Sequence, residues 1–321
     1  MLRHLCFLLF LVFIFQRGYA LDEKNLPVSF SNAEILNKYT TRIPFKLVDH
    51  LIVVKAKIFN QEGNFIIDTG SESMILNKVH FPNLYQHQTI KQNTSGILHS
   101  VENTYQKQIK EFILQNFKLK NKNSHVIDLS HIEKSKKFKL LGIIGYNILK
   151  DYEIFIDMHL NQITLAKVDA FGNTFDKNVY LEKIVDTISF NLKNHTIVVD
   201  GTINNQKVKF GIDTAAEFNQ INKRIGKKAL KYFIPKKRLQ LSGIGKIKIE
   251  VLAGKLHRVK LSETTYLGPM GTVLTNLSKM NEAFGTALDG ILGFEFFTQK
   301  RTIINYQKEK LYFINYPIAS R

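Results

Sequence analysis

The chain contains one long internal repeat, and this repeat constrains the fold more than any other feature of the sequence. An offset of 145 residues aligns residues 43–69 with residues 188–214 without a gap, and 14 of the 27 aligned positions are identical. Farther along, residues 142–146 (GIIGY) recur as residues 290–294 (GILGF) at an offset of 148. Duplication on this scale predicts two similar structural units. We therefore expect two lobes of one fold, with small loop insertions between the matching segments.

Within each copy, the residue pattern predicts β-strands. Residues 52–54 are β-branched, residues 60–63 (NQEG) are typical of a turn, and residues 65–67 form a short apolar run that ends at Asp68. The closing part of each copy predicts one short helix followed by a β-hairpin. The sequence thus predicts an all-β fold. The predicted units are an N-terminal segment (21–42), lobe 1 (43–166), a connector (167–187) and lobe 2 (188–321).

The first twenty residues predict a secretory signal peptide. Arg3 and His4 precede an unbroken apolar run at residues 5–15, and small residues stand just before Leu21. Eleven apolar residues are too few to span a bilayer, which needs about 20. We therefore expect residues 1–20 to be cleaved and the mature protein to be exported, periplasmic or secreted, without a stable membrane anchor. Cys6, the only cysteine, lies inside this segment, so no disulfide is expected in the mature chain.

The composition argues for a globular protein with a basic surface. The full chain has 45 Lys+Arg and 27 Asp+Glu, a formal net charge of +18, and is 44% hydrophobic, which is too apolar for a disordered protein. Removing the signal peptide, with its two arginines, leaves 43 − 27 = +16. The lysines are scattered in ones and twos without a nucleic-acid motif. We expect a solvated basic surface and no nucleic-acid partner.

The ten histidines do not form a metal-binding pattern. No H-E-x-x-H motif is present, and no cysteine remains after signal cleavage. The sequence therefore predicts neither a metal nor a cofactor. His50 and His195 occupy equivalent positions in the repeat, and we expect a structural role for both.

Each lobe places one aspartate directly after a short apolar strand, Asp68 in lobe 1 and Asp213 in lobe 2. Taken alone, such an aspartate commonly caps a turn or a helix. Two similar lobes, however, usually pack about a pseudo-twofold axis, where equivalent residues meet. Two adjacent carboxyl groups share one proton over a wide pH range. The ionised member can activate a water molecule while the protonated member donates to a carbonyl oxygen, which is chemistry suited to amide hydrolysis.

These motifs resemble those of the retropepsin and pepsin group of aspartic proteases. Residues 68–71 (DTGS) follow an apolar strand, and about 70 residues later comes the apolar-apolar-Gly element at residues 143–145. Lobe 2 carries the equivalent pair at residues 213–216 (DTAA) and 291–293 (ILG). The resemblance covers both lobes, and each is more similar to a retropepsin subunit or a bacterial retropepsin-like domain than to a pepsin lobe.

The resemblance implies a bilobal acid-protease fold, with two tandem retropepsin-like closed β-barrels in one chain. Such a protein would be a monomer, with an intramolecular pseudo-dimer, and an aspartic endopeptidase acting on peptide or protein substrates without a cofactor. Catalysis would fall to Asp68 and Asp213, and a β-hairpin flap would cover the cleft. The residues expected to support the two aspartates are Thr69, Gly70, Ser71, Thr214 and Ala215, with hydrogen bonds between the threonines and from Ser71 to a carboxylate. The possible flap residues are Ser95, Gly96, Ser242 and Gly243.

Lobe 2 departs from the family pattern at Ala215, which occupies the position of Gly70. An added methyl group is tolerated there only if the local φ is negative and the cleft has room. Ala215 leaves open a second hypothesis, a non-catalytic peptide-binding protein with a degenerate cleft. A third, weaker alternative is hydrolysis of another exported substrate, with the basic surface selecting acidic polymers.

Overall fold

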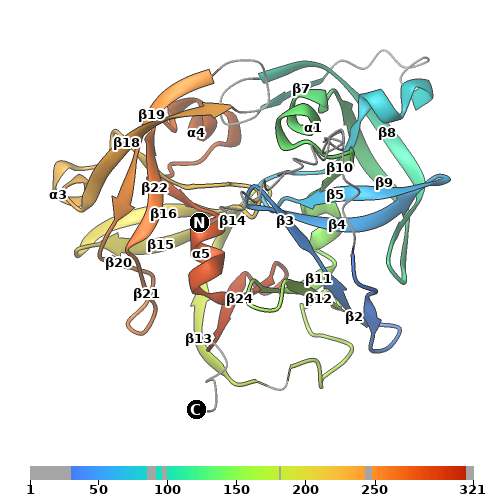
Figure 1. Cartoon of the computed structure of the whole chain (residues 1–321). Helices are drawn as coiled ribbons and strands as arrows, with labels where there is room; N and C mark the ends of the chain where they lie inside the picture. The colour runs from blue at the N-terminus through green and yellow to red at the C-terminus, as the bar shows by residue number, and fades with distance from the viewer. Residues whose placement is uncertain (1–29, 85–91, 96–99, 181, 243–247, 316–321) are drawn as a thin grey trace, which may run out of the picture.

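The computed structural model describes residues 30–84, 92–95, 100–180, 182–242 and 248–315 (Figure 1). The predicted signal peptide lies outside these residues. In the described part, two β-barrels flank the centre of the molecule, and a third sheet lies beneath them (Figure 1). The prediction of a mostly β, acid-protease-like fold is confirmed.

The barrel of lobe 1 closes on itself. Six strands pair in the order β4-β5-β10-β6-β9-β8, and β8 returns to β4 through the pairs Lys57↔Ile113 and Ile58↔Phe112. Alternating burial along β4 places its apolar side chains inside and its lysines in solvent. These strands and their neighbours are β3 (Lys46–Val48), β4 (Leu51–Ile58), β5 (Gln61–Ile67), β6 (Met74–Asn77), β7 (Gln92–Ser95), β8 (Ser100–Leu114), β9 (Phe117–Ile127) and β10 (Leu140–Ile144).

Lobe 2 repeats this pairing with one strand divided. Its β15–β20 pairs, Thr202↔Lys260 and Ile203↔Val259, are equivalent to the β4–β8 pairs of lobe 1. Residues 257–258 separate β19 from β20, where β8 runs without a break. The strands are β14 (Asn191–Lys193), β15 (Thr196–Ile203), β16 (Gln206–Ile212), β17 (Asn219–Asn222), β18 (Phe233–Ser242), β19 (Lys248–Leu256), β20 (Val259–Lys260), β21 (Tyr266–Leu267), β22 (Met270–Thr275) and β23 (Gly290–Leu292).

Short helices occupy equivalent places in the two lobes. The predicted helix after each apolar-apolar-Gly element is present as α2 (Tyr146–Leu149) and α5 (Phe294–Gln299). A second equivalent pair, α1 (Ser130–Lys136) and α4 (Ser278–Phe284), was not expected from the sequence. Lobe 2 adds α3 (Lys227–Leu230), and lobe 1 has two 3₁₀ turns, η1 (Lys78–His80) and η2 (Pro82–Leu84). None of the described helices is long and apolar enough to cross a membrane.

A seven-stranded sheet joins the lobes beneath the barrels. Its order is β1-β2-β12-β11-β24-β25-β13, with the two predicted closing hairpins side by side at its centre. On this sheet Arg301 donates to Asp157 at 3.0 and 2.6 Å, and Asn305 donates to Glu153 at 2.7 Å; all four side chains are buried. The strands are β1 (Glu34–Ile35), β2 (Thr40–Pro44), β11 (Tyr152–Asp157), β12 (Gln162–Lys167), β13 (Ile184–Ser189), β24 (Arg301–Asn305) and β25 (Lys310–Ile314).

Candidate active site

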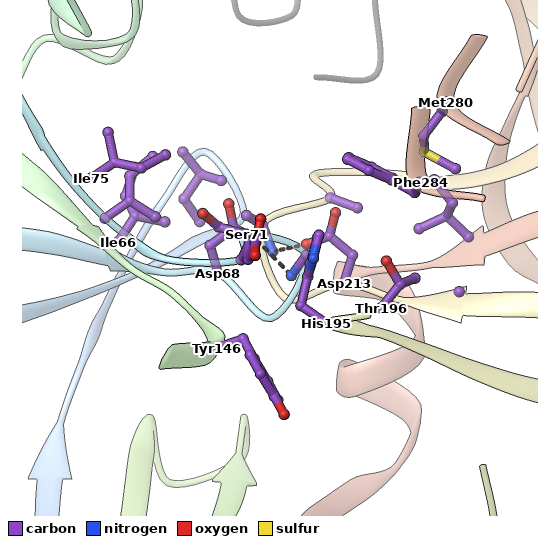
Figure 2. Close-up of a pocket in the computed structure, with 18 of the residues that line it drawn as sticks. Ile66, Asp68, Ser71, Ile75, Tyr146, His195, Thr196, Asp213, Met280 and Phe284 are labelled. Atoms are coloured by element: carbon purple, nitrogen blue, oxygen red, sulfur yellow. Dashed lines mark hydrogen bonds between the residues drawn. The ribbon is translucent and has the colours of Figure 1, made fainter. Parts of the chain in front are cut away.

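The structure brings Asp68 and Asp213 together at the centre of the molecule (Figure 2). Each follows the last residue of a buried strand, and its backbone N–H donates to the neighbouring strand: Asp68 to Ile144 O and Asp213 to Leu292 O, both at 3.0 Å. The two loops then approach each other closely. A methyl group built on Gly70 would lie only 2.8 Å from Asp213 Cγ. The two aspartates identified from the repeat therefore form one pair.

The threonines after the aspartates interlock across the pseudo-twofold axis. Thr69 N donates to Thr214 Oγ1 and Thr214 N donates to Thr69 Oγ1, each at 3.0 Å. Each hydroxyl then donates to the opposite lobe, Thr214 Oγ1 to Ile67 O at 2.8 Å and Thr69 Oγ1 to Ile212 O at 3.3 Å. Both side chains are completely buried or nearly so. These four hydrogen bonds fix the two aspartate loops relative to each other.

Backbone donors and burial set the protonation of the pair. Gly70 N donates to Asp68 Oδ1 and Ala215 N donates to Asp213 Oδ1, each at 2.8 Å. Burial, then the neighbouring Asp213 carboxylate, raise the pKa of Asp68 well above its ordinary value. Burial also raises the pKa of Asp213, while the hydrogen bonds from Ala215 and Asp68 oppose that rise. Both pKa values are thus raised, and the pair shares one proton over a wide pH range.

Ala215 fits its position in the loop. Neither it nor Gly70 has a positive φ, so the backbone does not require glycine. The Ala215 methyl group packs against the apolar cluster of lobe 1 that includes Leu51 and Ile66. Ser71 differs from expectation: its hydroxyl donates to Ser73 O at 3.0 Å, because the loop folds back there, and not to a carboxylate. The Ser71 hydroxyl thus supports the loop, whereas the Ser71 backbone hydrogen-bonds to the Asp68 carboxyl and opposes the rise of its pKa.

A cleft of about 1580 Å³ opens over the pair, and both lobes line it. Two hairpins border it, β7–β8 of lobe 1 through Gln106 and β18–β19 of lobe 2 through Leu241 and Ile249. Of the residues predicted for the flaps, Ser95 ends β7 and Ser242 ends β18, whereas Gly96 and Gly243 lie outside the described residues. Strand β7 also approaches α4 of the opposite lobe. The two serines of the flap prediction thus lie at strand ends in the hairpins that border the cleft.

The two equivalent histidines have different surroundings. His50 stacks on Phe294 with ring centroids 4.1 Å apart, and its Nδ1 lies 3.1 Å from Glu217 O, so it joins the lobes as a structural residue. His195 lines the cleft and packs its edge against Phe284 at 5.3 Å. Neither ring nitrogen of His195 has a hydrogen bond of normal geometry among the described residues, although the ring interacts with the Gly70 backbone. The expectation of a structural role holds for His50 but does not explain His195.

Two further cleft residues were missed by the sequence analysis. Glu72, four residues after Asp68, interacts electrostatically with His125 and His195, whereas its equivalent Glu217 pairs with Lys136 at 2.7 Å. The signal was present, because a glutamate follows the aspartate by four residues in both copies of the repeat. Tyr146 also lines the cleft (Figure 2). Among the described residues, no group of three or more His, Cys, Asp or Glu side chains could hold a metal ion.

Comparison with protein families agrees with this geometry. Residues 52–157 match the family model described as retroviral aspartyl protease. This segment is a retropepsin-like aspartyl protease domain. The domain runs from β4 to β11 and contains Asp68, the threonine beneath the pair and the closed six-stranded barrel. The family match does not extend to lobe 2, whose likeness to this domain rests on the sequence repeat and on the equivalent strand pairings. A search of curated proteins finds no match.

Proposed function

We propose that the protein is an exported aspartic endopeptidase, in which one chain supplies both aspartates of the catalytic pair. Membership of lobe 1 in the retropepsin-like family supports a peptidase in general. The observation that carries the finer proposal is the pairing of Asp68 with Asp213 at the base of a cleft that both lobes line. Export rests on the apolar run at residues 5–15 and on the small residues that follow it.

In the proposed mechanism, a peptide lies extended in the cleft and a water molecule lies between the two carboxyl groups. Asp213, which we assign as the ionised member, removes a proton from the water as the water oxygen attacks the scissile carbonyl carbon. Asp68, assigned as the protonated member, donates its proton to the carbonyl oxygen, giving a neutral tetrahedral intermediate. Asp213 then returns its proton to the leaving nitrogen, Asp68 takes back the hydroxyl proton, and the C–N bond breaks. No covalent enzyme intermediate is formed.

The geometry around Ala215 favours this mechanism over a binding protein with a degenerate cleft. The Ala215 N–H still donates to Asp213, as Gly70 does to Asp68, so the methyl group has not removed the hydrogen bond that orients the carboxylate. The four hydrogen bonds of the threonine pair are likewise intact. A cleft retained only for binding would not need these features.

The proposal is tested by peptide cleavage. The protein, purified after expression of the full chain, is incubated with a diverse peptide pool from pH 3 to 8, and products are identified by mass spectrometry. We expect cleavage at mildly acidic pH and a loss of at least about 100-fold in Asp68→Asn and in Asp213→Asn. Asp200→Asn is the matched control, because that aspartate lies on the solvent-exposed side of lobe 2, where it pairs with Lys209.

Each outcome decides between the hypotheses. Cleavage that persists in both active-site variants would contradict the assignment of the pair. Peptide binding without cleavage at any pH would favour the non-catalytic protein. N-terminal sequencing of the purified protein tests export, with Leu21 as the expected first residue.

A further inference from the structure

The two lobes present different surfaces to the cleft on either side of the aspartate pair. In lobe 1, cross-strand pairing aligns one row of residues on the sheet: Val53, Ile66, Ile143 and Ile75. The equivalent row in lobe 2 is Val198, Gly211, Ile291 and Gln220. Two bulky aliphatic residues of lobe 1 are thus replaced by a glycine and an amide in lobe 2. Ile66 and Ile75 of lobe 1 line the cleft, and so do their equivalents in lobe 2, Gly211 and Gln220.

The first residues of β4 and β15 also differ in polarity, with an apolar residue in lobe 1 and a polar residue in lobe 2. Leu51, the first residue of β4, is equivalent to Thr196, the first residue of β15, and both line the cleft. Leu51 belongs to the apolar cluster of lobe 1 together with Ile66 and Ile75. The lobe 1 side is therefore a continuous aliphatic surface near the pair. Its row ends in a polar residue, His125, whose Nδ1 is already 3.0 Å from Ser73 Oγ.

On the lobe 2 side, buried polar groups are left without partners. His195 is 5% exposed and Thr196 is 8% exposed. Neither the ring nitrogens of His195 nor the Thr196 hydroxyl has a hydrogen bond of normal geometry within the described chain, although the ring also interacts with the Gly70 backbone. Both residues line the cleft beside Asp213 and Phe284 (Figure 2). Among the described residues that line the cleft, His131 also has a buried nitrogen without a hydrogen bond. His131 is less buried than His195 and lies on α1 of lobe 1. Unsatisfied buried polar groups cost free energy, so adjacent ones at a cleft are groups that a bound ligand can satisfy.

The chemistry of these groups selects the ligand. Burial lowers the pKa of His195, and the opposing effects of Glu72 and of the Gly70 backbone are smaller, which favours the neutral imidazole. A neutral imidazole offers one donor and one acceptor, and a threonine hydroxyl offers both. A primary carboxamide carries a carbonyl acceptor and an amino donor on the same carbon and can satisfy both residues. A carboxylate supplies no donor and would face Glu72, and an aliphatic side chain would leave all three atoms unpaired.

We infer that the lobe 2 subsite recognises a glutamine or asparagine side chain of the substrate, while the lobe 1 subsite accepts a large aliphatic side chain. This inference rests on the proposed protease function and adds a substrate class to it. The enzyme would cleave between a carboxamide residue on one side of the scissile bond and an aliphatic residue on the other. His195 and Thr196 are then specificity-determining residues that contact the substrate side chain.

The repeat provides a reciprocal test, because each lobe holds the residue that the other lacks. A cleaved peptide is varied with Leu, Gln, Glu or Lys at the positions flanking the scissile bond, and kcat/KM is measured for each. We expect Gln to be favoured over Leu about tenfold on one side and Leu over Gln about tenfold on the other. Thr196→Leu should reverse the first preference and leave the second unchanged. Leu51→Thr should weaken the second and leave the first unchanged, and His195→Leu should weaken only the first.

Binding separates this inference from the question of catalysis. The same peptides with a reduced, uncleavable central bond are titrated into the wild-type protein and the three variants by calorimetry. An absence of cleavage would contradict the protease function, yet the Gln and Leu preferences would still appear in the dissociation constants. The inference is wrong if Gln and Leu bind equally on both sides, if Lys or Glu is preferred to Gln, or if Thr196→Leu and Leu51→Thr alter the same side.

Discussion

The interlocked threonines predict a large and unequal loss of stability when either hydroxyl is removed. In Thr214→Val, the side chain keeps its shape but loses the oxygen that accepts from Thr69 N at 3.0 Å and donates to Ile67 O at 2.8 Å. A buried donor and a buried acceptor are then left without these partners. Each such group costs about 1–3 kcal/mol, so the free energy of unfolding should fall by about 2–6 kcal/mol. This is a large fraction of the 5–15 kcal/mol that typically stabilises a folded protein.

The distances also predict an order among the variants. Thr69→Val removes the equivalent oxygen, but its outgoing bond to Ile212 O is longer, at 3.3 Å, so its loss should be smaller. Thr214→Ser is the matched control, because it keeps the hydroxyl and loses one buried methyl group, worth about 1 kcal/mol. Urea denaturation followed by circular dichroism measures all three. A loss below 0.5 kcal/mol in Thr214→Val, or an equal loss in Thr214→Ser, would refute the reasoning.

Three further predictions concern the site and the sheet beneath it. Gly70→Ala should lower kcat/KM about 100-fold, because its methyl group would displace the Asp213 carboxyl, whereas Ala215→Gly should stay within about threefold. The pKa of Asp68 is raised above 3.8 in the folded protein, so protonation of this carboxyl stabilises the fold. Relative to Asp68→Asn, the wild type should therefore be more stable below about pH 4, and this added stability should be lost as the pH rises through the raised pKa. Urea denaturation midpoints of both proteins at acid and neutral pH measure the difference. Arg301→Met should cost about 3–5 kcal/mol in urea denaturation, and the exposed Arg238→Met should cost less than about 1 kcal/mol.

Much of the fold could be predicted because the duplication shows the same strand pattern twice. The apolar run that ends at Asp68, the short helix after Gly145 and the closing hairpins are all present where the repeat placed them. Helices α1 and α4 were missed, since each is only seven residues long and its two copies share little sequence. Strand β13 begins at Ile184, inside the predicted connector, because it pairs with β25 and so completes the sheet beneath the lobes.

The sequence predicted the centre of the site better than its walls. A carboxyl pair on a pseudo-twofold axis follows from identical residues in both copies, and the threonine pair follows from the same identity. The proposed subsites depend on positions where the two copies differ, such as Leu51 and Thr196. Identity between the copies cannot reveal such positions. The role of His195 could not be predicted, because its twin His50 is satisfied by Phe294 and Glu217 O and only the structure separates the two.

The sheet beneath the lobes makes the two halves of the chain chemically complementary. Lobe 1 contributes two acids to its centre, Glu153 and Asp157, whereas the equivalent positions of lobe 2 hold Arg301 and Asn305. Two copies of lobe 1 packed in this way would bury carboxylate against carboxylate, and two copies of lobe 2 would leave Arg301 without its buried partner Asp157, although Glu182 of the connector also pairs with it. Neither half can therefore replace the other in a symmetric dimer. The two copies of the repeat are thus not interchangeable at this sheet, and the peptide connection between them keeps one of each in every molecule.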